Sequence, residues 1–341
     1  MNLSLNILSY NRDDIIEKNI NNLIIIKKKL EEDTLNKVEI NIVDNLSTDN
    51  TKTILKKFDN SCVNIIHSLT NSGVAKGRNQ ALRKSLGDWH FILDDDSIIS
   101  LDAVEKFINY ANDNVDNNIG IVALNILEMR TEALLSNLIN IESCEQFSNF
   151  GGGAFVINND LLTNIGGMDE LCTFGGEELD YSIRCIDAGF KMTFLKEAVI
   201  HHYGKDRTGA VLIGRRKNWL FNYVRVLFKH FPFPNNVIYS SRYFVLVFAN
   251  AFRTIGPFKA FLLFPAFINA IKEGRRMKKI VKESTVKYYS YPNMLPEFGN
   301  IPLYKKIIKL KIRIDYESST NHRRYRPRWF IFGRTSFGKR I

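Results

Sequence analysis

In the first hundred residues, short apolar runs alternate with longer segments whose hydrophobic residues recur at helical spacing. The runs have the length of buried strands, and polar N-capping residues precede the helical segments. Strands that alternate with helices through short connections indicate a parallel sheet with right-handed crossovers. The pattern predicts strands at residues 3–9, 38–43, 63–67 and 89–93, and helices at 15–30 and 74–85 and from Ser47-Thr48-Asp49 to Phe58.

Glycine-rich turns dominate the middle of the chain. They lie at residues 151–153, 166–167 and 175–176. The last pair leads into a predicted helix that begins at Glu177. Two short strands are then predicted at 191–195 and 198–202, and the second ends in His201-His202.

From about residue 209 the pattern becomes helical and aromatic, and residues 242–279 have a membrane-like composition. Charged residues interrupt this stretch, among them Arg242, Arg253 and Lys259. Its longest charge-free runs, 243–252 and 260–271, are shorter than the roughly 20 residues that a membrane span needs. We expect amphipathic helices, which either pack on the preceding domain or lie at a membrane interface.

The positive charge of the chain is concentrated near its C-terminus. Residues 271–341 contain 19 Lys/Arg and 5 Asp/Glu, a net charge of +14, whereas the whole chain carries +11 and the first 270 residues therefore −3. A nucleic-acid-binding core normally carries its basic charge on the folded body, so no nucleic-acid partner is expected. A basic tail fits peripheral contact with an anionic membrane, or only solubilises the chain.

Four scattered cysteines, Cys62, Cys144, Cys172 and Cys185, form no CxxC pair. This argues against a zinc ribbon or a disulfide framework and fits a reducing compartment. The first residues, MNLSLNILSYNRDD, lack the basic start and cleavage site of a signal peptide. We therefore expect a cytoplasmic protein.

Each of the first four predicted strands is followed by polar residues. Ligands of parallel sheets bind at the carboxyl ends of the strands, which share one edge. Asn, Asp, Ser and Gly are also ordinary turn residues, so each group taken alone has a simpler explanation. Their coincidence predicts a binding site formed by Tyr10-Asn11-Arg12, Asp44-Asn45, Asn71-Ser72-Gly73 and Asp94-Asp95-Asp96.

Three consecutive carboxylates, Asp94 to Asp96, end the fourth strand in the segment FILDDDSII. Mg²⁺ and Mn²⁺ accept such oxygen ligands and commonly bridge them to substrate phosphates. His201 or His202 could complete the shell, which would favour Mn²⁺ because imidazole is a softer donor. The alternative is a solvated turn. The motifs GxxxxGK[ST], GxGxxG after the first strand, and GxSxG are absent, which argues against the usual kinases, dehydrogenases and esterases.

Seven segments in order resemble family 2 glycosyltransferases, which are inverting enzymes of the GT-A fold. They are LNILSYNR, VDNLSTDNT, NSGVAKGRNQAL, FILDDDS, GGGAFVINNDLLTNIGGMDE, GGEELDYSIRCIDAGF and AVIHHYG, and they span residues 3 to 205. The resemblance implies an α/β fold with a mostly parallel, Rossmann-like sheet flanked by helices, followed by a helical, basic C-terminal region. The later segments RRKNWLFNYVRVLFKHFP and KESTVKYY are similar to the rhamnosyltransferase-like branch.

The resemblance implies roles for individual positions. Asp94 and Asp96 match the DxD pair, with Asp96 the better candidate for metal contact and His201 or His202 as a further ligand. Asp95 or Asp94 would meet the ribose hydroxyls. The implied nucleotide-sugar pocket consists of Ser9, Tyr10, Arg12, Asp44, Asn71, Gly73, Arg78, Asp95, Gly152 and Gly153.

The general base is implied at the start of the helix at residue 177. The family usually has Glu-Asp there, with the second residue as the base, whereas this chain has Glu177-Glu178. Glu178 is the first candidate, and Glu177 and Asp180 remain alternatives. Acids in the first turn of a helix are also favoured by the helix dipole, without any catalytic role.

Together these observations predict a catalytic domain over residues 1–208, with a nucleotide-binding half (1–100) and an acceptor half (101–208). An amphipathic helical extension (209–285) and a basic tail (286–341) follow. The expected activity is metal-dependent (Mn²⁺ or Mg²⁺) transfer from a UDP- or dTDP-sugar to a hydroxyl of a glycan or lipid-linked acceptor. The resemblance places this in bacterial surface polysaccharide synthesis, on the inner face of the plasma membrane.

Two other functions compete with this one. A metal-dependent sugar-phosphate nucleotidyltransferase also uses acids at strand ends, but usually carries a Gly-rich, basic signature after its first strand, and SYNRDD has none. A non-enzymatic protein that binds nucleic acid or membrane through the basic tail is the second.

Overall fold

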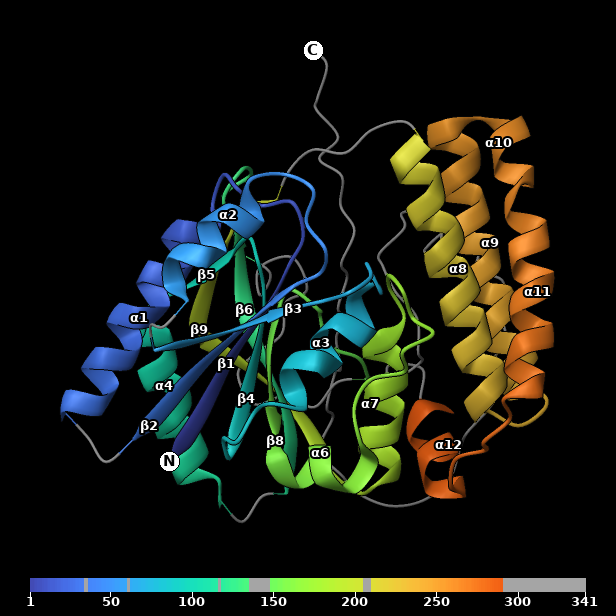
Figure 1. Ribbon diagram of the computed structural model, residues 1–341. Helices are drawn as coiled ribbons and strands as arrows, with labels where there is room; N and C mark the ends of the chain where they lie inside the picture. The colour runs from blue at the N-terminus through green and yellow to red at the C-terminus, as the bar shows by residue number, and fades with distance from the viewer. Residues whose placement is uncertain (34–35, 60–61, 116–117, 135–147, 205–209, 291–341) are drawn as a thin grey trace.

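The computed structural model describes residues 1–33, 36–59, 62–115, 118–134, 148–204 and 210–290. An α/β part built on a nine-stranded mixed sheet lies beside a part made of helices (Figure 1). Of the predicted basic tail, only its first residues belong to the described chain, and residues 291–341 lie outside it.

The first half of the sheet is parallel, as the alternating pattern predicts. Its strands lie in the order β3-β2-β1-β4, so that β1 sits between β2 and β4. The helices between them lie on the sheet faces (Figure 1). The elements are β1 (Asn2–Ser9), α1 (Ile16–Asp33), β2 (Lys37–Asp44), α2 (Thr51–Leu55) with a 3₁₀ turn (Lys56–Phe58), β3 (Val63–His67), α3 (Val74–Leu82) and β4 (Trp89–Asp94).

The second half of the sheet mixes directions. It continues β4-β8-β6-β9-β5, where β8 runs antiparallel to β4 and β6, and β7 pairs with β6. These elements are β5 (Ser97–Ile99), α4 (Leu101–Asp113), β6 (Ile119–Glu128), β7 (Ala133–Leu134), β8 (Ala154–Asn158), α6 (Asn159–Ile165), α7 (Glu177–Asp187) and β9 (Lys191–His202).

The two short strands predicted at 191–195 and 198–202 are wrong as separate strands, because they form the single strand β9. Its pairing with β6 shifts between Leu195, opposite Leu124, and Val199, opposite Asn125. An irregularity that leaves residues unpaired in one strand bends it without ending it. The sequence pattern predicted the break between residues 195 and 198 but not that one strand continues through it.

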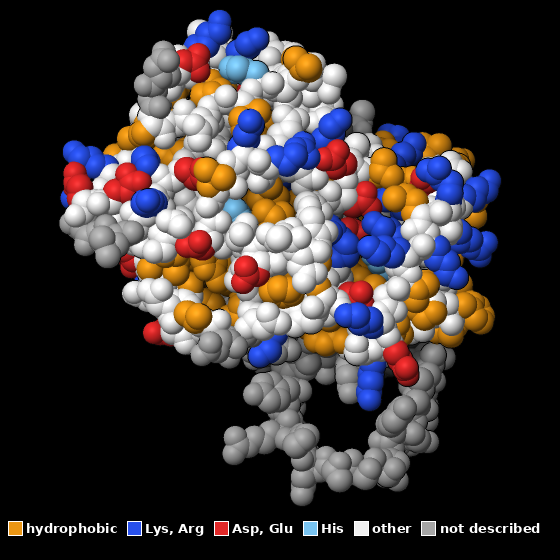
Figure 2. Space-filling view, turned by 60° about the horizontal axis from the view of Figure 1, so that its bottom comes forward, with side chains coloured by type: hydrophobic (Ala, Val, Ile, Leu, Met, Phe, Trp, Pro, Cys, Tyr) orange, Lys and Arg blue, Asp and Glu red, His pale blue; other side chains and the backbone are white. Residues whose placement is uncertain are grey.

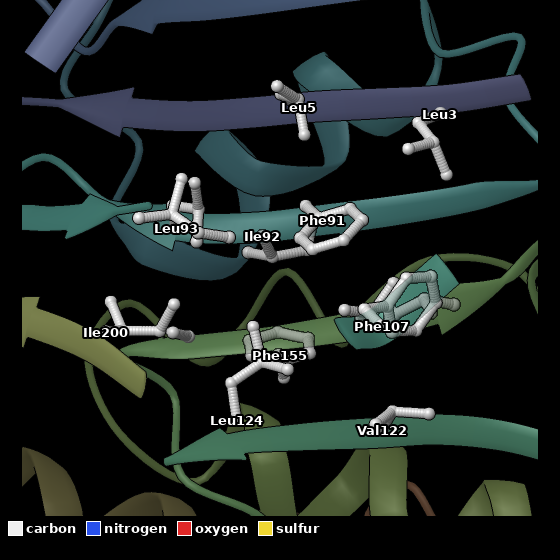
Figure 3. Packing of buried hydrophobic residues seen from close by; sticks show 14 of the residues in the cluster. Leu3, Leu5, Phe91, Ile92, Leu93, Phe107, Val122, Leu124, Phe155 and Ile200 are labelled. Carbon is white, nitrogen blue, oxygen red and sulfur yellow. The ribbon is translucent and has the colours of Figure 1, made fainter. Parts of the chain in front are cut away.

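A single hydrophobic cluster fills the space between the sheet and its helices. Phe91 of β4 packs edge-on against Phe107 of α4, with 4.9 Å between ring centroids. Figure 3 shows these rings with Leu93 of β4 and Phe155 of β8, all buried. Because β4 is covered on both faces by this cluster, the position of its carboxyl end is fixed by packing.

The helical part consists of α8 to α12. Its cluster includes Leu179 and Ile183 of α7, so α7 contributes to both parts of the molecule. Gly274 lets α11 approach α8 closely, since a Cβ there would lie 2.5 Å from the Arg225 carbonyl oxygen. None of the helices in the described ranges is both long and apolar enough to cross a membrane. The bounds are α8 (Ala210–His230), α9 (Asn235–Ile255), α10 (Pro257–Phe261), α11 (Leu263–Arg276) and α12 (Glu283–Ser290).

Candidate active site at the carboxyl ends of the strands

Asp94, Asp95 and Asp96 lie where β4 turns into β5, at the edge of the sheet that the parallel strands reach with their carboxyl ends. The mutual repulsion of three adjacent carboxylates is offset by two buried arginines, Arg12 and Arg78, which approach from different elements. Burial of both guanidinium groups strengthens these pairs, because little water competes for them.

Arg12 follows β1 and holds two of the carboxylates. Its Nε donates to Asp95 Oδ1 at 2.9 Å, and its Nη2 donates to Asp96 Oδ2. The backbone N–H of Tyr10 donates to the other oxygen of Asp95 at 2.9 Å. Burial raises the pKa of Asp95 to about 7, since Asp96 adds repulsion and Arg12 opposes the rise only in part.

Arg78, on α3, lies between Asp94 and the start of α7. Its Nη2 donates to Asp94 Oδ1 at 2.8 Å and to the Gly152 carbonyl at 2.6 Å, and its Nη1 lies 3.6 Å from Glu177 Oε1. Burial acts to lower the pKa of Arg78, but Asp94, Glu177 and Glu178 outweigh it and raise that pKa. One cation therefore connects the strand-end carboxylates to the glutamates of α7.

His202 completes a cluster with two of the aspartates. Ligand atoms of Asp94, Asp96 and His202 all lie within 4.8 Å of one another, and His202 Nε2 is 3.3 Å from Asp96 Oδ1. His201, the neighbouring residue of β9, is exposed and is not part of the cluster. Side chains of successive strand residues point to opposite faces, so only one histidine can reach the aspartates.

The cluster fits a divalent cation. Two carboxylate oxygens with one imidazole nitrogen form a donor set that suits Mn²⁺ and, less well, Mg²⁺. The Asp94 side chain is 39% exposed and that of His202 is 20% exposed, so the cluster is open on one side. A ligand's phosphates could approach from there.

Glu128, the last residue of β6, is a site residue that the sequence analysis missed. Its Oε2 lies 2.9 Å from His202 Nδ1. Burial lowers the pKa of His202, but the Asp96 and Glu128 carboxylates outweigh this and raise it to about 9. In the sequence, Glu128 could have been found as an acid that directly follows the apolar run IGIVALNIL, in the same way as the aspartates follow the fourth strand.

The predicted pocket residues after the other strands lie on the same edge. Asp44 is buried, accepts from the Ser47 N–H at 2.9 Å and lies 3.3 Å from His67 Nδ1. Tyr10 is 44% exposed, whereas Ser9 is buried and its Oγ has no hydrogen-bond partner among the described residues.

Asn71 and Gly73 shape the loop before α3. Asn71 Oδ1 accepts from Asn45 Nδ2 at 3.2 Å. Gly73 has φ +80, and a Cβ there would lie 2.6 Å from the backbone of Thr173. Only glycine combines this conformation with so close an approach. Thr173 O accepts from the Val74 N–H at 2.8 Å, which ties the loop before α7 to the start of α3.

Gly152 and Gly153 pass directly beneath the strand-end carboxylates. Gly153 O accepts from the Asp94 N–H and from Ser97 Oγ, each at 3.1 Å. A Cβ on Gly152 would lie 1.9 Å from Glu178 Oε1. The glycines therefore allow β4, Arg78 and Glu178 to meet in one place.

The three acids predicted as candidate bases have different surroundings. Glu178 is half-buried, whereas Glu177 is buried and its Oε2 has no hydrogen-bond partner in the described structure. Burial raises the pKa of Glu178 and raises that of Glu177 further, with the Glu178 charge adding to the latter. Glu178 is the more accessible of the two.

Asp180 is fully buried and faces the helical part. Arg184 Nε, Lys229 Nζ and His230 Nε2 contact its oxygens at 2.7 to 2.8 Å. Burial opposes ionisation of Asp180, but these groups outweigh it and hold its pKa well below the usual range. An acid with every oxygen engaged is suited to joining α7 to α8 and not to accepting a substrate proton.

Known proteins are similar to this chain over part of the region that forms the candidate site. The model of the family described as "Glycosyl transferase family 2" matches residues 4–168. An uncharacterised glycosyltransferase of Haemophilus influenzae is 29% identical over 116 residues, 34% of this chain and 36% of the relative. A putative teichuronic acid biosynthesis glycosyltransferase of Bacillus subtilis, TuaG, is 30% identical over 104 residues, which are 30% of this chain and 38% of TuaG. The matched part thus spans little more than a third of either relative's length.

Solved structures share the fold over most of the chain. TarS 1–349 of S. aureus in complex with UDP-GlcNAc superposes with a TM-score of 0.59 and 16% identity, covering 84% of this chain and 83% of that one. The mannosyltransferase PcManGT of Pyrobaculum calidifontis, in complex with GDP-Man and Mn²⁺, gives a TM-score of 0.53 and 16% identity over 81% and 84% of the two chains. Such likeness at low identity demonstrates the GT-A-like architecture.

Proposed function

Because this chain belongs to glycosyl transferase family 2 through residues 4–168, we propose that it transfers a sugar from a nucleotide diphosphate to an acceptor hydroxyl, with inversion at the anomeric carbon. The observation that carries the proposal is the link from the Asp94–Asp96–His202 cluster through Arg78 to the glutamates of α7. It joins a site suited to a diphosphate to a site suited to a base.

In this proposal Glu178 is the general base. Its carboxylate takes the proton of the acceptor hydroxyl while the hydroxyl oxygen attacks the anomeric carbon, and the bond to the nucleotide diphosphate breaks on the opposite face. Partial burial supports the role, because a raised pKa makes the carboxylate a stronger base. Glu177 would hold Arg78 in position, and Glu178 would take the proton.

The diphosphate gains negative charge as it leaves. Arg78 is fixed by Asp94 and Gly152, so its positive charge is available to the leaving group without reorganisation. Its Nη1 and Nε are buried without a hydrogen-bond partner among the described residues, and Nη1 lies 3.6 Å from Glu177 Oε1. Asp94, Asp96 and His202 would hold a divalent ion, and such an ion supplies Lewis-acid neutralisation of the diphosphate.

For the donor we propose a UDP- or dTDP-sugar, held by Asp44, Tyr10, Arg12 and Asp95 at the ends of β1, β2 and β4. The neighbouring folds carry UDP-GlcNAc in one case and GDP-Man in another, which supports a nucleotide sugar as the class. For the acceptor we propose a glycan or lipid-linked saccharide of the bacterial surface, supported by the likeness to TuaG. Membrane contact at the inner face of the plasma membrane belongs to the same proposal.

The test is to add UDP-, dTDP- and GDP-sugars to the full chain with and without Mn²⁺ and to measure thermal unfolding. A ligand at a hundred times its Kd stabilises the folded state by about 2.7 kcal/mol. We expect Mn²⁺-dependent stabilisation by one nucleotide sugar, and its loss in Asp96→Ala. The wild type should also hydrolyse the nucleotide sugar that stabilises it, slowly releasing the free sugar and the nucleoside diphosphate.

Two outcomes would contradict the proposal. One is full turnover by Asp96→Ala with Mn²⁺ present. The other is release of pyrophosphate from a nucleoside triphosphate and a sugar phosphate, which would identify a nucleotidyltransferase instead.

A further inference from the structure

The corner formed by the end of α9, α10 and the start of α11 exposes large apolar side chains. We call the six residues Phe252, Phe258, Phe261, Leu262, Phe264 and Ile268 the apolar tip. Phe258 is 90% exposed, and the other five are between 41% and 57% exposed. Gly256, at φ +87, and Pro257 at the first helical position turn the chain sharply, so that α10 caps the corner.

Three phenylalanines of the apolar tip are connected through a fourth aromatic ring. The ring of Phe248 lies between them, with centroid distances of 6.3 Å to Phe252, 5.6 Å to Phe261 and 5.5 Å to Phe264. Single exposed apolar residues are ordinary on protein surfaces, whereas a contiguous aromatic patch marks a contact surface. The patch projects at a corner and is not a groove, so it suits insertion into a soft surface better than reception of a peptide.

Along the sequence, the segment that carries the apolar tip is basic. Residues 210–272, from the start of α8 nearly to the end of α11, contain nine Lys/Arg and no Asp or Glu. Arg253 and Lys259 are exposed at either side of the corner. Figure 2, which turns the bottom of Figure 1 toward the viewer, shows the end of the helical part away from α10, where Lys and Arg side chains also lie among hydrophobic ones.

We propose that the apolar tip docks on an anionic lipid bilayer, with Phe258, Phe261 and Leu262 inserted among the acyl chains and Arg253 and Lys259 against the headgroups. An apolar face flanked by basic residues binds such surfaces through burial together with electrostatic attraction.

Docking at this corner would also orient the candidate active site. In Figure 1, α10 lies at the upper end of the helical part, and β1 runs toward that end from the N-terminus below. The carboxyl ends of the parallel strands, with Asp94 and Asp96, therefore face the same side as the apolar tip. The inference deepens the proposed function, and rests on it in this respect, because a lipid-linked acceptor would reach the site from that side.

The experiment is sedimentation of the full chain with phosphatidylcholine vesicles and with vesicles containing phosphatidylglycerol, without nucleotide. We expect binding to the anionic vesicles only. Phe258→Ser/Leu262→Ser should weaken it about tenfold or more, because burial of both apolar side chains is lost. Lys259→Gln should weaken it roughly fivefold. Leu86→Ser, at an 85% exposed apolar residue before β4, is the matched control and should bind as the wild type does.

Three results would overturn the docking. The first is no binding of the wild type to anionic vesicles, and the second is equal vesicle binding by Phe258→Ser/Leu262→Ser. The third is a wild-type protein that does not bind vesicles but forms a dimer in solution, which this variant abolishes. The last would identify a second copy of the chain as the occupant. Stabilisation by the nucleotide sugar in solution is measured on the same variants. Vesicle binding without stabilisation by a nucleotide sugar would support the docking and contradict the proposed function. Stabilisation by a nucleotide sugar without vesicle binding would support the proposed function and contradict the docking.

Discussion

Arg78 donates a hydrogen bond to Asp94 at 2.8 Å, and this contact joins α3 to the end of β4 inside the candidate site. The same guanidinium also donates to Gly152 and lies near Glu177. One planar guanidinium group therefore contacts three partners in different directions, which the compact ammonium group of a lysine cannot do.

Arg78→Lys should therefore lose transfer while the protein stays folded and positively charged at this position. We expect the transfer rate to fall roughly 10²- to 10³-fold, as on loss of a group that stabilises developing charge. Initial rates at saturating donor measure the effect. Arg83→Lys is the matched control, because Arg83 lies on the surface beside α3 and pairs with Glu170. A rate within twofold of the wild type would show that Arg78 does not act on the diphosphate.

Glu178→Gln should bind the nucleotide sugar normally and lose transfer by about 10²- to 10⁴-fold, because the proton acceptor is missing. In the wild type the rate should rise with pH as Glu178 loses its proton, and the rise should occur above the usual glutamate range because burial raises this pKa. Rate–pH profiles of both proteins test this. Glu105→Gln, on the exposed face of α4, serves as control. If Glu178→Gln transfers at the wild-type rate, the base is another residue.

Gly152→Ala should displace the Glu178 carboxylate, since the added Cβ would lie 1.9 Å from Glu178 Oε1. The clash is with the end of a flexible side chain, so we expect a folded protein with a strongly reduced transfer rate. Gly214→Ala is the control, because no atom lies within 4 Å of its Cβ position, and in a helix it should stabilise by about 1 kcal/mol. Unchanged activity of Gly152→Ala would mean that the position of Glu178 is unimportant.

Glu128→Gln should weaken Mn²⁺ binding about 10- to 100-fold, the usual effect of removing a group that orients a metal-binding histidine. Glu128 lies 2.9 Å from His202 Nδ1 and has no place in the cluster itself. Titration calorimetry with Mn²⁺ measures the affinity, and His202→Ala sets the scale for loss of the ligand. Equal affinities of wild type and Glu128→Gln would leave Glu128 without a role in the site.

Asp180→Asn should lower the free energy of unfolding by about 3–5 kcal/mol, because Arg184, Lys229 and His230 lose a buried counterion. Since the pKa of Asp180 is held well below 3.8, its ionised form stabilises the fold above that pH, and this stabilisation is lost as the pH falls toward the folded-state pKa. The difference from the wild type should therefore be full at neutral pH and shrink in acid.

Denaturant unfolding at several pH values checks the Asp180 prediction. Asp102→Asn, which breaks the exposed pair with Lys106 on α4, should cost only about 0.5 kcal/mol. A loss of that small size in Asp180→Asn would show that the buried pairs contribute little.

The first four strands and the carboxylates after them could be predicted because each depends on local pattern. An apolar run followed by polar residues marks a strand end wherever the strand is placed. The parallel order then brings Tyr10, Asp44 and Asp94 to one edge, without any knowledge of side-chain contacts.

The partners of these residues could not be predicted, because they depend on register. Whether His201 or His202 meets Asp96 is fixed by the pairing of β9 with β5 and β6, and the irregularity after Leu195 changes that pairing. Glu128 is selected by the same register, since it lies opposite His202. The burial of Asp180 depends on how α8 docks against α7, and no spacing within α7 indicates it.

That docking has a consequence for the order in which the chain acquires its structure during synthesis. The helix that carries Glu177 and Glu178 also carries Asp180, and two of the three counterions of Asp180 are Lys229 and His230, at the end of α8. Until residue 230 has left the ribosome, α7 holds a carboxylate that its final surroundings cannot yet neutralise. The nascent nucleotide-binding strands can pair long before then, but the base can be set in place only after some fifty further residues have been made.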